Sequence, residues 1–568
     1  MPPSTPDPTR WLTDLMAAQQ KFVQSLGSPA LPDPAQAAPS GMPWQPAVEA
    51  MTQWQQQAMQ QMTSLWSAAM PVSSTDGDAP APDRRFAADP WRRDPRFEAL
   101  TRTYLQGSQQ LRDALATARL DERGKAHWGF LLRQVVDAAS PANCLATNPE
   151  AMQMAVDSGG ASLMEGLRLF MQDLAKGRVS MTDDQAFEVG RNVATSPGSV
   201  VFENELIQLV QYAPTTAKVH KRPLVIVPPC INKFYILDLQ PDNSFVGHAV
   251  AQGHTVFLVS WRNAGPAQGH LGWDDYLEQG VMQALDVALA ISRADRVNTL
   301  GFCVGGTLLA SALAVLAARG EDKVSSLTLL TAMLDFSDTG ELGLMVDETS
   351  VAARERAIGK GGLVKGRELA QVFAALRAND LIWPYVVNGY LKGKAPPAFD
   401  LLFWNGDDTN LPGPMYCWYL RNTYLENKLR EPGETVQCGE PVDLGALDVP
   451  AFIYASREDH IVPWQTAYKS TELLGGETTF VLGASGHIAG VINPPAKNKR
   501  NYWVGDVEPD ADAWLENARS EPGSWWPAWD GWLKTHAGAL VPAPKNAGSA
   551  KHAVIEAAPG RYVKAKAP

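Results

Sequence analysis

Six short apolar segments, separated by stretches of helical periodicity, constrain the fold of this 568-residue chain more than any other feature. They are RPLVIVPP (222–229), HTVFLVSW (254–261), VNTLGF (297–302), SSLTLLTAML (325–334), PAFIYASRED (450–459) and ETTFVLG (477–483). The segment YLEQGVMQALDVALAIS (276–292), between the second and third runs, has the periodicity of a helix. Apolar strands joined by helices predict a parallel sheet that is covered on both faces.

The composition of the segments outside the six apolar runs predicts the other domains of the chain. Residues 335–449 interrupt the alternation and are rich in aromatic residues, glycine and asparagine, so we predict a cap or lid inserted over the strand ends. Residues 84–205 have mostly helical periodicity and predict a helical N-terminal domain, followed by an α/β domain over 206–537. Residues 1–83 form a variable segment and linker, and the Ala-, Pro- and Lys-rich tail at 538–568 is expected to be poorly ordered.

The N-terminal segment contains one amphipathic pattern. Its apolar residues repeat at helical spacing, and the opposite face is mostly glutamine. Two interpretations stay open: a helix that packs on its own domain, or a helix that binds a partner or a surface. The residues are Met51, Trp54, Ala58, Met62 and Leu65.

Charge and cysteine usage exclude several classes of protein. The formal net charge is −12 and there is no long basic run, which argues against nucleic acid as a partner. The five cysteines are scattered without a CxxC pair, which favours a reduced, cytoplasmic protein without a disulfide framework or a metal site. We find no signal peptide, and the most apolar helical stretch is too short for a transmembrane segment.

The sequence Gly301-Phe302-Cys303-Val304-Gly305 lies where an apolar strand meets a helix. A turn this tight lifts its central side chain above the sheet edge, and glycines on both sides avoid clashes. The backbone N–H of Val304 would then point at the position of an oxyanion, at the positive end of the helix. A small buried core thiol is the alternative interpretation of Cys303.

Two further segments favour the catalytic interpretation. Asp459 follows one apolar run and His487 follows the next. The chain order nucleophile, acid, histidine is that of the α/β-hydrolase fold, and all three residues are expected at strand ends, where open α/β sheets place their sites. Taken singly, Asp459 could be a helix cap and His487 a loop histidine. His460, directly after the acid, is given a supporting role.

A second oxyanion donor is expected from the loop after an early strand. In this chain that loop is PPCINKFY, and the predicted donor is the N–H of Ile231 or a neighbour. Cys230 in the same loop is expected to be a packed thiol.

Long motifs in a fixed order resemble those of the class I polyhydroxyalkanoate synthases. They run from about residue 90 to 532 and include ADPWRRDPRF, GRNVATSPGSVVFENELIQL, GFCVGG, DLLFWNGDDTNLPGPMYCWYLRNTYLENKL, SREDHIVPW and SGHIAGVINPP. The resemblance implies an α/β-hydrolase fold, an acyltransferase, and a catalytic triad of Cys303, Asp459 and His487. It also implies that Trp404 lies at the subunit contact of a homodimer.

The same resemblance implies the reaction and the partners. The family polymerises (R)-3-hydroxyacyl-CoA and releases CoA; its class I members generally prefer short acyl chains, which favours 3-hydroxybutyryl-CoA as the substrate of this chain. Coenzyme A is therefore a leaving group carried by the substrate, and no separate cofactor is expected. The growing polyester, the granule surface and possible granule-associated proteins would be its partners, with a cytoplasmic location at polymer granules.

Two alternatives to this function are kept. A Cys-dependent hydrolase, of the thioesterase or dienelactone-hydrolase type, would use the same three residues with water. A granule-coat or scaffold protein would leave them unexplained. The sequence leaves open the acyl chain length, the state of the lid, and whether Asp459 acts directly on the substrate hydroxyl or through His487. It also leaves open which basic residues bind CoA; the candidates are Lys233, Arg262, Arg421, Lys497, Lys499 and Arg500.

Overall fold

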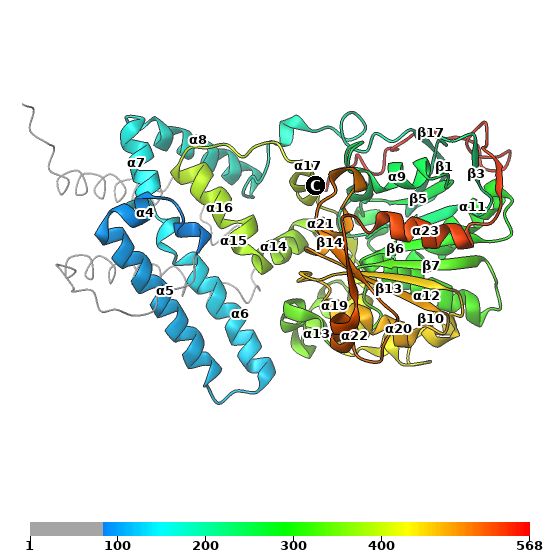
Figure 1. The fold of residues 1–568 in the computed structure, drawn as a ribbon. Coiled ribbons are helices and arrows are strands. Elements are labelled where there is room, and N and C mark those ends of the chain that lie inside the picture. Colours follow the sequence, from blue (N-terminus) through cyan, green and yellow to red (C-terminus); the bar gives the residue numbers. More distant parts are fainter. Residues whose placement is uncertain (1–82, 568) are drawn as a thin grey trace, which may run out of the picture. The chain divides into compact units, whose positions relative to one another are not determined.

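The computed structural model describes residues 83–567, and the chain forms two compact units (Figure 1). The helical unit contains the described residues up to Val179 together with Ala378–Lys394. The sheet unit contains Ser180–Arg377 and the residues from Ala395 onward. The apolar pattern predicted between Met51 and Leu65, and the linker after it, lie outside the described residues.

The helical unit is built on helices whose starts are fixed by side-chain caps. Asp94, Asp121 and Asn148 each accept a hydrogen bond from a backbone N–H of the first turn that follows. The helices are α4 (Pro90–Arg93), α5 (Pro95–Ala116), α6 (Glu122–Ala138), α7 (Pro149–Asp157), α8 (Ala161–Lys176), α15 (Ala378–Leu381), α16 (Trp383–Tyr385) and the π-helical segment η9 (Val386–Leu391). Short 3-10 turns join them.

The sheet unit is organised around an 11-stranded sheet with the order β15-β14-β13-β12-β7-β6-β4-β5-β2-β1-β17. The strands are β1 (Gly198–Glu203), β2 (Ile207–Tyr212), β4 (Leu224–Val227), β5 (Val256–Trp261), β6 (Val297–Phe302), β7 (Val324–Leu330), β12 (Ala451–Ser456), β13 (Thr478–Gly483), β14 (Asn501–Val504), β15 (Arg519–Pro522) and β17 (Glu556–Ala557). The run from β13 to β5 is parallel. The six predicted strands are these six parallel strands, so the predicted α/β sheet is confirmed.

Helices cover both faces of the sheet (Figure 1). On β4, Val225 and Val227 belong to one core, while Leu224 and Ile226 belong to the other. Strands buried on both faces explain why the six runs are apolar without alternation. The helices are α9 (Phe245–Ala251), α10 (Trp273–Asp275), η7 (Tyr276–Met282), α11 (Gln283–Ser292), α12 (Val304–Ala318), α19 (Trp464–Tyr468), α20 (Ser470–Leu473), α21 (His487–Val491), α22 (Ala511–Asn517) and α23 (Trp526–His536).

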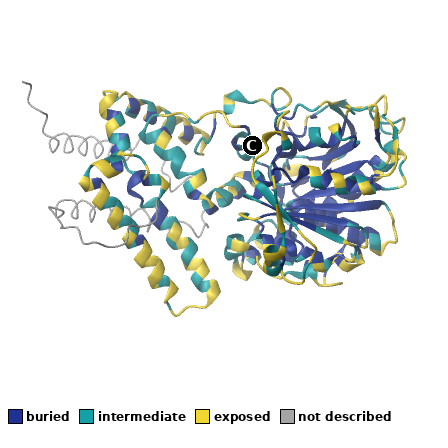
Figure 2. Ribbon diagram, viewed as in Figure 1, coloured by how far each residue is buried: buried dark blue, intermediate teal, exposed yellow. Residues whose placement is uncertain are grey.

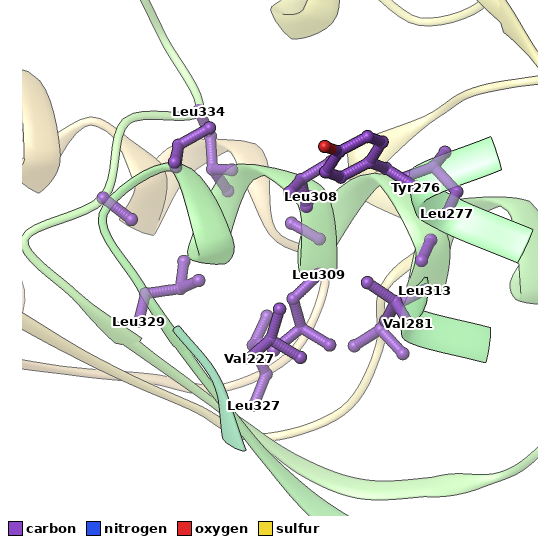
Figure 3. Close-up of a cluster of buried hydrophobic side chains, with 14 of the residues drawn as sticks. Val227, Tyr276, Leu277, Val281, Leu308, Leu309, Leu313, Leu327, Leu329 and Leu334 are labelled. Carbon is purple, nitrogen blue, oxygen red and sulfur yellow. The ribbon is translucent and has the colours of Figure 1, made fainter. Parts of the chain in front are cut away.

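Helix α12 is the most deeply placed of the crossover helices. Every residue from Val304 to Leu316 is buried. Figure 3 shows its leucines between the strand residues Val227 and Leu327 and the residues Tyr276 and Val281 of η7. This packing fixes the start of α12, and therefore the turn before it, against the sheet.

The insertion predicted over 335–449 is present between the end of β7 and the start of β12. Its middle part differs from the prediction, because Ala378–Lys394 belongs to the helical unit. There the Tyr390 hydroxyl donates to Asp173 Oδ2 at 2.7 Å, and a Cβ on Gly166 of α8 would lie 2.0 Å from the Tyr390 carbonyl oxygen. The remaining elements are η8 (Gly340–Met345), α13 (Glu348–Ile358), β8 (Leu363–Val364), α14 (Gly366–Leu376), α17 (Asp400–Asn405), β9 (Leu411–Pro412), α18 (Gly413–Tyr419), η10 (Leu420–Leu425), η11 (Lys428–Arg430), β10 (Val436–Gln437), β11 (Glu440–Pro441) and η12 (Leu444–Ala446).

Both ends of the sheet unit depart from the sequence-based boundaries. The predicted helical domain over 84–205 takes in β1 and the residues from Ser180, which belong to the sheet unit. The tail at 538–568, expected to be poorly ordered, instead forms β16 (Leu540–Pro542), which pairs with β3 (Lys218–His220), and β17, which pairs with β1. Tyr562 and Val563 are buried, so two apolar anchors hold a segment whose composition resembles a loose tail.

Candidate active site

Cys303 occupies the turn between β6 and α12 in a strained conformation, with φ 53° and ψ −130°. The close approach of neighbouring backbone explains the two glycines of the motif. A Cβ on Gly301 would lie 2.4 Å from the Cα of Gly306, and a Cβ on Gly305 would lie 2.3 Å from the Val227 carbonyl oxygen. The sequence therefore folds into the tight strand–helix turn that was predicted, with the sulfur at the carboxyl end of the sheet.

Val304 is the first residue of α12, and its side chain is buried. Among the described residues the Val304 N–H has no hydrogen-bond acceptor, whereas the N–H of Gly306 donates to the Cys303 carbonyl at 2.8 Å. The positive end of a 15-residue helix is therefore directed at the space beside the thiol. This position suits an oxyanion, and the role assigned to Val304 stays a prediction.

Asp459 and His487 are brought together although they follow different strands, β12 and β13. The Nδ1 atom of His487 lies 2.6 Å from Asp459 Oδ2. The other carboxylate oxygen accepts hydrogen bonds from the N–H groups of Ile461, at 2.8 Å, and Val462, at 2.9 Å. The Asp459 side chain is fully buried, so its carboxylate is held by three donors and faces the histidine.

The electrostatics of His487 connect it to the thiol. Burial lowers the pKa of His487, but the negative charges of Asp459 and Cys303 and hydrogen bonds to both raise it to about 10. The ring also stacks on Phe302, with centroids 5.7 Å apart. The arrangement orients an imidazole that can take a proton from Cys303 and keep it.

His460 lies beside the pair without completing it. Burial and the charge of Arg377 lower the pKa of His460 to about 4, so this ring is neutral at neutral pH. Its Nδ1 atom is buried and has no hydrogen-bond partner among the described residues. The supporting role given to His460 stays a prediction.

Ile231 lies in the loop after β4, at the same edge of the sheet, and is partly buried against the core. Two side chains hold the loop by hydrogen bonds to its backbone carbonyl oxygens. Thr409 Oγ1 donates to the Cys230 carbonyl at 3.2 Å, and Trp404 Nε1 donates to the Lys233 carbonyl at 2.6 Å. Cys230 is buried, as expected for a packed thiol, and burial raises its pKa.

Trp404 itself is only 5% exposed and belongs to a core of the sheet unit. Its indole N–H is already used on Lys233, so within one chain it acts as an internal anchor of the loop. Its assignment to a subunit contact stays a prediction.

A cavity of about 110 Å³ lies under the insertion. Tyr419 and Tyr424 line it, and both phenols interact electrostatically with Cys303. Burial is the main cause of the raised pKa of each tyrosine, and the charge of Cys303 adds to it. The cavity is otherwise mainly apolar, with lining residues that include Ile231, Leu342, Met345, Val346, Leu369, Val372, Phe373 and Leu420.

The sequence analysis missed these tyrosines. Their only signal is the aromatic density of the inserted segment. Several basic residues considered for CoA binding already interact with other parts of the protein. Lys233 is buried, and Arg421 forms ion pairs with Glu348, Glu355 and Glu426. The arginine at 262 stacks on Tyr562, with its guanidinium carbon 4.3 Å from the ring centroid.

Comparisons with known proteins agree with this geometry. The family model described as "Poly-beta-hydroxybutyrate polymerase (PhaC) N-terminus" matches residues 82–249, and the model described as "alpha/beta hydrolase fold" matches residues 223–494. Among curated proteins, the poly(3-hydroxyalkanoate) polymerase subunit PhaC of Cupriavidus necator is 55% identical over 90% of this chain and 88% of that protein.

More distant relatives carry the same description. The PhaC subunit of Rhizobium meliloti is 42% identical over 85% of this chain and 80% of that protein. The poly(3-hydroxyalkanoate) polymerase of Methylorubrum extorquens is 40% identical over 92% of this chain and 88% of that protein. With a strained cysteine turn, a buried Asp–His pair and an α/β-hydrolase sheet, this chain belongs to the poly(3-hydroxyalkanoate) polymerase family.

Proposed function

We propose that the chain, as an acyltransferase of this family, polymerises (R)-3-hydroxyacyl-CoA through a covalent acyl-Cys303 intermediate and releases CoA. The observation that carries this proposal is the hydrogen-bonded chain from Asp459 through His487 to Cys303, with the pKa of His487 raised to about 10. The imidazole takes the thiol proton, and the thiolate attacks the thioester carbonyl. The N–H groups of Val304 and Ile231 would hold the oxyanion, after which CoA leaves with the proton from His487.

A thiol suits a reaction that must keep the acyl group activated. Attack of a thiolate on a thioester gives another thioester, so the exchange is nearly balanced in free energy. An acyl-serine ester would be a lower-energy resting point, and the next attack by a hydroxyl group would be harder. The strained turn places the sulfur at the start of α12, where the N–H groups of the first helical turn can stabilise an oxyanion.

Elongation requires that the 3-hydroxyl of a hydroxyacyl group attack the acyl-cysteine. We assign the proton transfer in this step to His487, with Asp459 as the residue that orients it. Both oxygens of Asp459 already accept hydrogen bonds, and its side chain is fully buried. A substrate hydroxyl would reach Nε2 of the histidine, whereas Nδ1 is occupied by the carboxylate.

We propose that a short acyl chain occupies the cavity that Ile231, Tyr419 and Tyr424 line. Its volume of about 110 Å³ is well below the roughly 300–1,000 Å³ typical of sites for drug-sized ligands. Its apolar lining suits a hydrocarbon chain and excludes the water that would end polymerisation by hydrolysis. We therefore propose 3-hydroxybutyryl-CoA as the substrate, rather than a long-chain analogue.

The location and partners are proposed from the reaction. Among residues 83–567 the structure has no helix whose length and apolar character would let it cross a bilayer. We propose that the protein works as a homodimer in the cytoplasm, at the surface of the polymer granules that its product forms, together with possible granule-associated proteins.

The deciding experiment gives purified protein 3-hydroxybutyryl-CoA and follows CoA release, turbidity and the mass of the Cys303 peptide. We expect CoA release to accompany insoluble polymer and an acyl adduct on Cys303. Cys438→Ala is the matched control, because this half-buried thiol lies outside the site and burial raises its pKa to about 12. Release of CoA together with free 3-hydroxybutyrate and no polymer would identify a hydrolase instead.

A further inference from the structure

The C-terminal tail returns to the loop that carries the proposed oxyanion donor. Lys233, two residues after Ile231, is only 2% exposed, and its Nζ atom donates to the carbonyl oxygen of Ala565 at 2.7 Å. The side-chain amide of Asn263 donates to the same carbonyl at 3.4 Å. A lysine considered for CoA binding is therefore enclosed by the protein, and the backbone carbonyl of Ala565 accepts its hydrogen bond.

A second contact lies beside the first. Lys566 Nζ lies 2.9 Å from Asp407 Oδ1, and the other oxygen of this buried carboxylate accepts a hydrogen bond from the Tyr235 hydroxyl at 2.9 Å. The ammonium group of Lys566 also lies 5.4 Å from the centroid of the Phe403 ring. Lys233 and Tyr235 both belong to the oxyanion loop, 228–235: Lys233 contacts the tail directly, and Tyr235 is linked to it through Asp407.

The tail is anchored before it reaches these points. β17 adds to the edge of the sheet on β1. Tyr562 is buried, its N–H donates to Gln208 Oε1 at 3.1 Å, and its hydroxyl donates to the Asn204 carbonyl at 2.7 Å. A segment fixed at both ends can transmit the position of the rigid sheet to the loop.

We propose that residues 562–566 form a C-terminal clasp that positions the oxyanion loop for acylation of Cys303, with Lys233 as the positioning residue. An oxyanion donor must lie about 2.7–3.1 Å from the developing charge, so a small displacement of Ile231 weakens transition-state stabilisation. Without the Ala565 carbonyl, Lys233 would be a buried cation lacking its acceptor, and the loop would move to expose it. This inference rests on the oxyanion role proposed for Ile231.

The test compares two reactions of the same thiol in the full-length protein. Acylation by 3-hydroxybutyryl-CoA passes through an oxyanion, whereas alkylation by iodoacetamide requires the thiolate but forms no oxyanion. The variants are Lys233→Met, which keeps the length of the side chain but removes its donor, and a deletion of residues 565–568. Lys564→Met is the matched control, because this exposed lysine lies in the clasp, whereas the contacts described above are made by Ala565 and Lys566.

Rapid-quench acylation should fall about 10- to 100-fold in both clasp variants, because loss of a whole oxyanion donor costs about 10²–10³-fold. Alkylation should stay within about twofold of wild type, and Lys564→Met should match wild type in both reactions. If Lys233→Met does not fold, the deletion carries the test, with Tm measured for each variant.

Acylation at the wild-type rate in the deletion variant would overturn the clasp, and so would an equal loss of acylation and alkylation, which would mean general damage to the site. Failure of the proposed function gives a different result. In that case the wild-type protein would itself form no acyl adduct on Cys303, whatever the tail does.

Discussion

Two helices of similar length, α12 in the sheet unit and α8 in the helical unit, bury opposite kinds of surface. Every residue of α12 from Val304 to Leu316 is buried. Helix α8 instead buries Ser162, Gly166 and Asp173, and its other residues are intermediate or exposed (Figure 2). The exposed apolar residues of α8 are Met164 at 68%, Leu167 at 36%, Met171 at 51% and Leu174 at 61%.

This difference between α12 and α8 reflects how the two units use their apolar residues. In the sheet unit, apolar residues fill two cores that hold the turn at Cys303 and the Asp459–His487 pair in place. In the helical unit, the spacing of 3, 4 and 3 residues on α8 is that of a helix–helix seam, yet it faces outward. Trp128 on α6 is also exposed, at 55%. The catalytic residues therefore lie in the sheet unit, and the described helical unit leaves apolar side chains of α8 and α6 exposed.

The largest effect should come from the catalytic side of this comparison. Cys303→Ala should lower polymer synthesis and CoA release by at least about 10⁴-fold, because it removes the nucleophile that forms the acyl intermediate. The small side chain fits the strained turn, so circular dichroism and Tm should match those of the wild type. Polymer formation by this variant at even one-tenth of the wild-type rate would exclude Cys303 as the nucleophile.

Asp459→Asn should have the second-largest effect, a loss of about 10³–10⁴-fold in turnover. The amide keeps the shape but removes the charge that orients and stabilises the protonated His487. Because both oxygens of Asp459 are occupied, acylation and elongation should fall by similar factors in rapid-quench experiments with labelled substrate. A burst of acyl-Cys303 without polymer would contradict this, and would assign Asp459 directly to the substrate hydroxyl.

The same substitution should change the pH dependence of stability. The pKa of His487 in the folded state, about 10, lies above its unfolded value, so its contribution is complete below about pH 6.5 and is lost as the pH rises toward 10. The free energy of unfolding of the wild type should therefore fall across this window, and Asp459→Asn should show a flatter curve. A wild-type curve without this fall would mean that His487 is neutral in the folded protein.

Local sequence signals account for most of what could be predicted. The six apolar strands, the glycines around Cys303 and the strand-end positions of Asp459 and His487 follow from short-range patterns. The chain order then implies that these residues meet, and the 2.6 Å contact shows that the Asp459–His487 pair does.

The features that could not be predicted depend on contacts between distant segments. The β1–β2 hairpin turns at Asn204, whose side chain accepts hydrogen bonds from the N–H groups of Leu206 and Ile207, yet it lies in a stretch assigned to helices. The tail from residue 538 has the composition of a linker and becomes ordered through pairing with β1 and β3. The burial of Lys233 depends on a carbonyl 332 residues away.

Two glycine-to-alanine substitutions, one in each unit, should change the free energy of unfolding in opposite directions. Gly305→Ala places a Cβ within 2.3–2.7 Å of the backbone at Val227 and Pro228, and should destabilise the sheet unit by about 3 kcal/mol or more. Gly107→Ala, in α5, meets no atom within 4 Å and should stabilise the helical unit by about 0.5–1 kcal/mol. Urea unfolding of both variants checks the signs, and equal effects would contradict the close approach of backbone at the catalytic turn.

The smallest effect should come from the outward face of α8, tested by the same change in both helices. Leu309→Ala in α12 removes a fully buried side chain and should cost about 2–5 kcal/mol of unfolding free energy. Leu174→Ala in α8, at 61% exposure, should cost less than about 0.5 kcal/mol and leave the initial rate of CoA release unchanged. If Leu174→Ala were as costly as Leu309→Ala, the face of α8 would be covered in solution, and the contrast between the two helices would disappear.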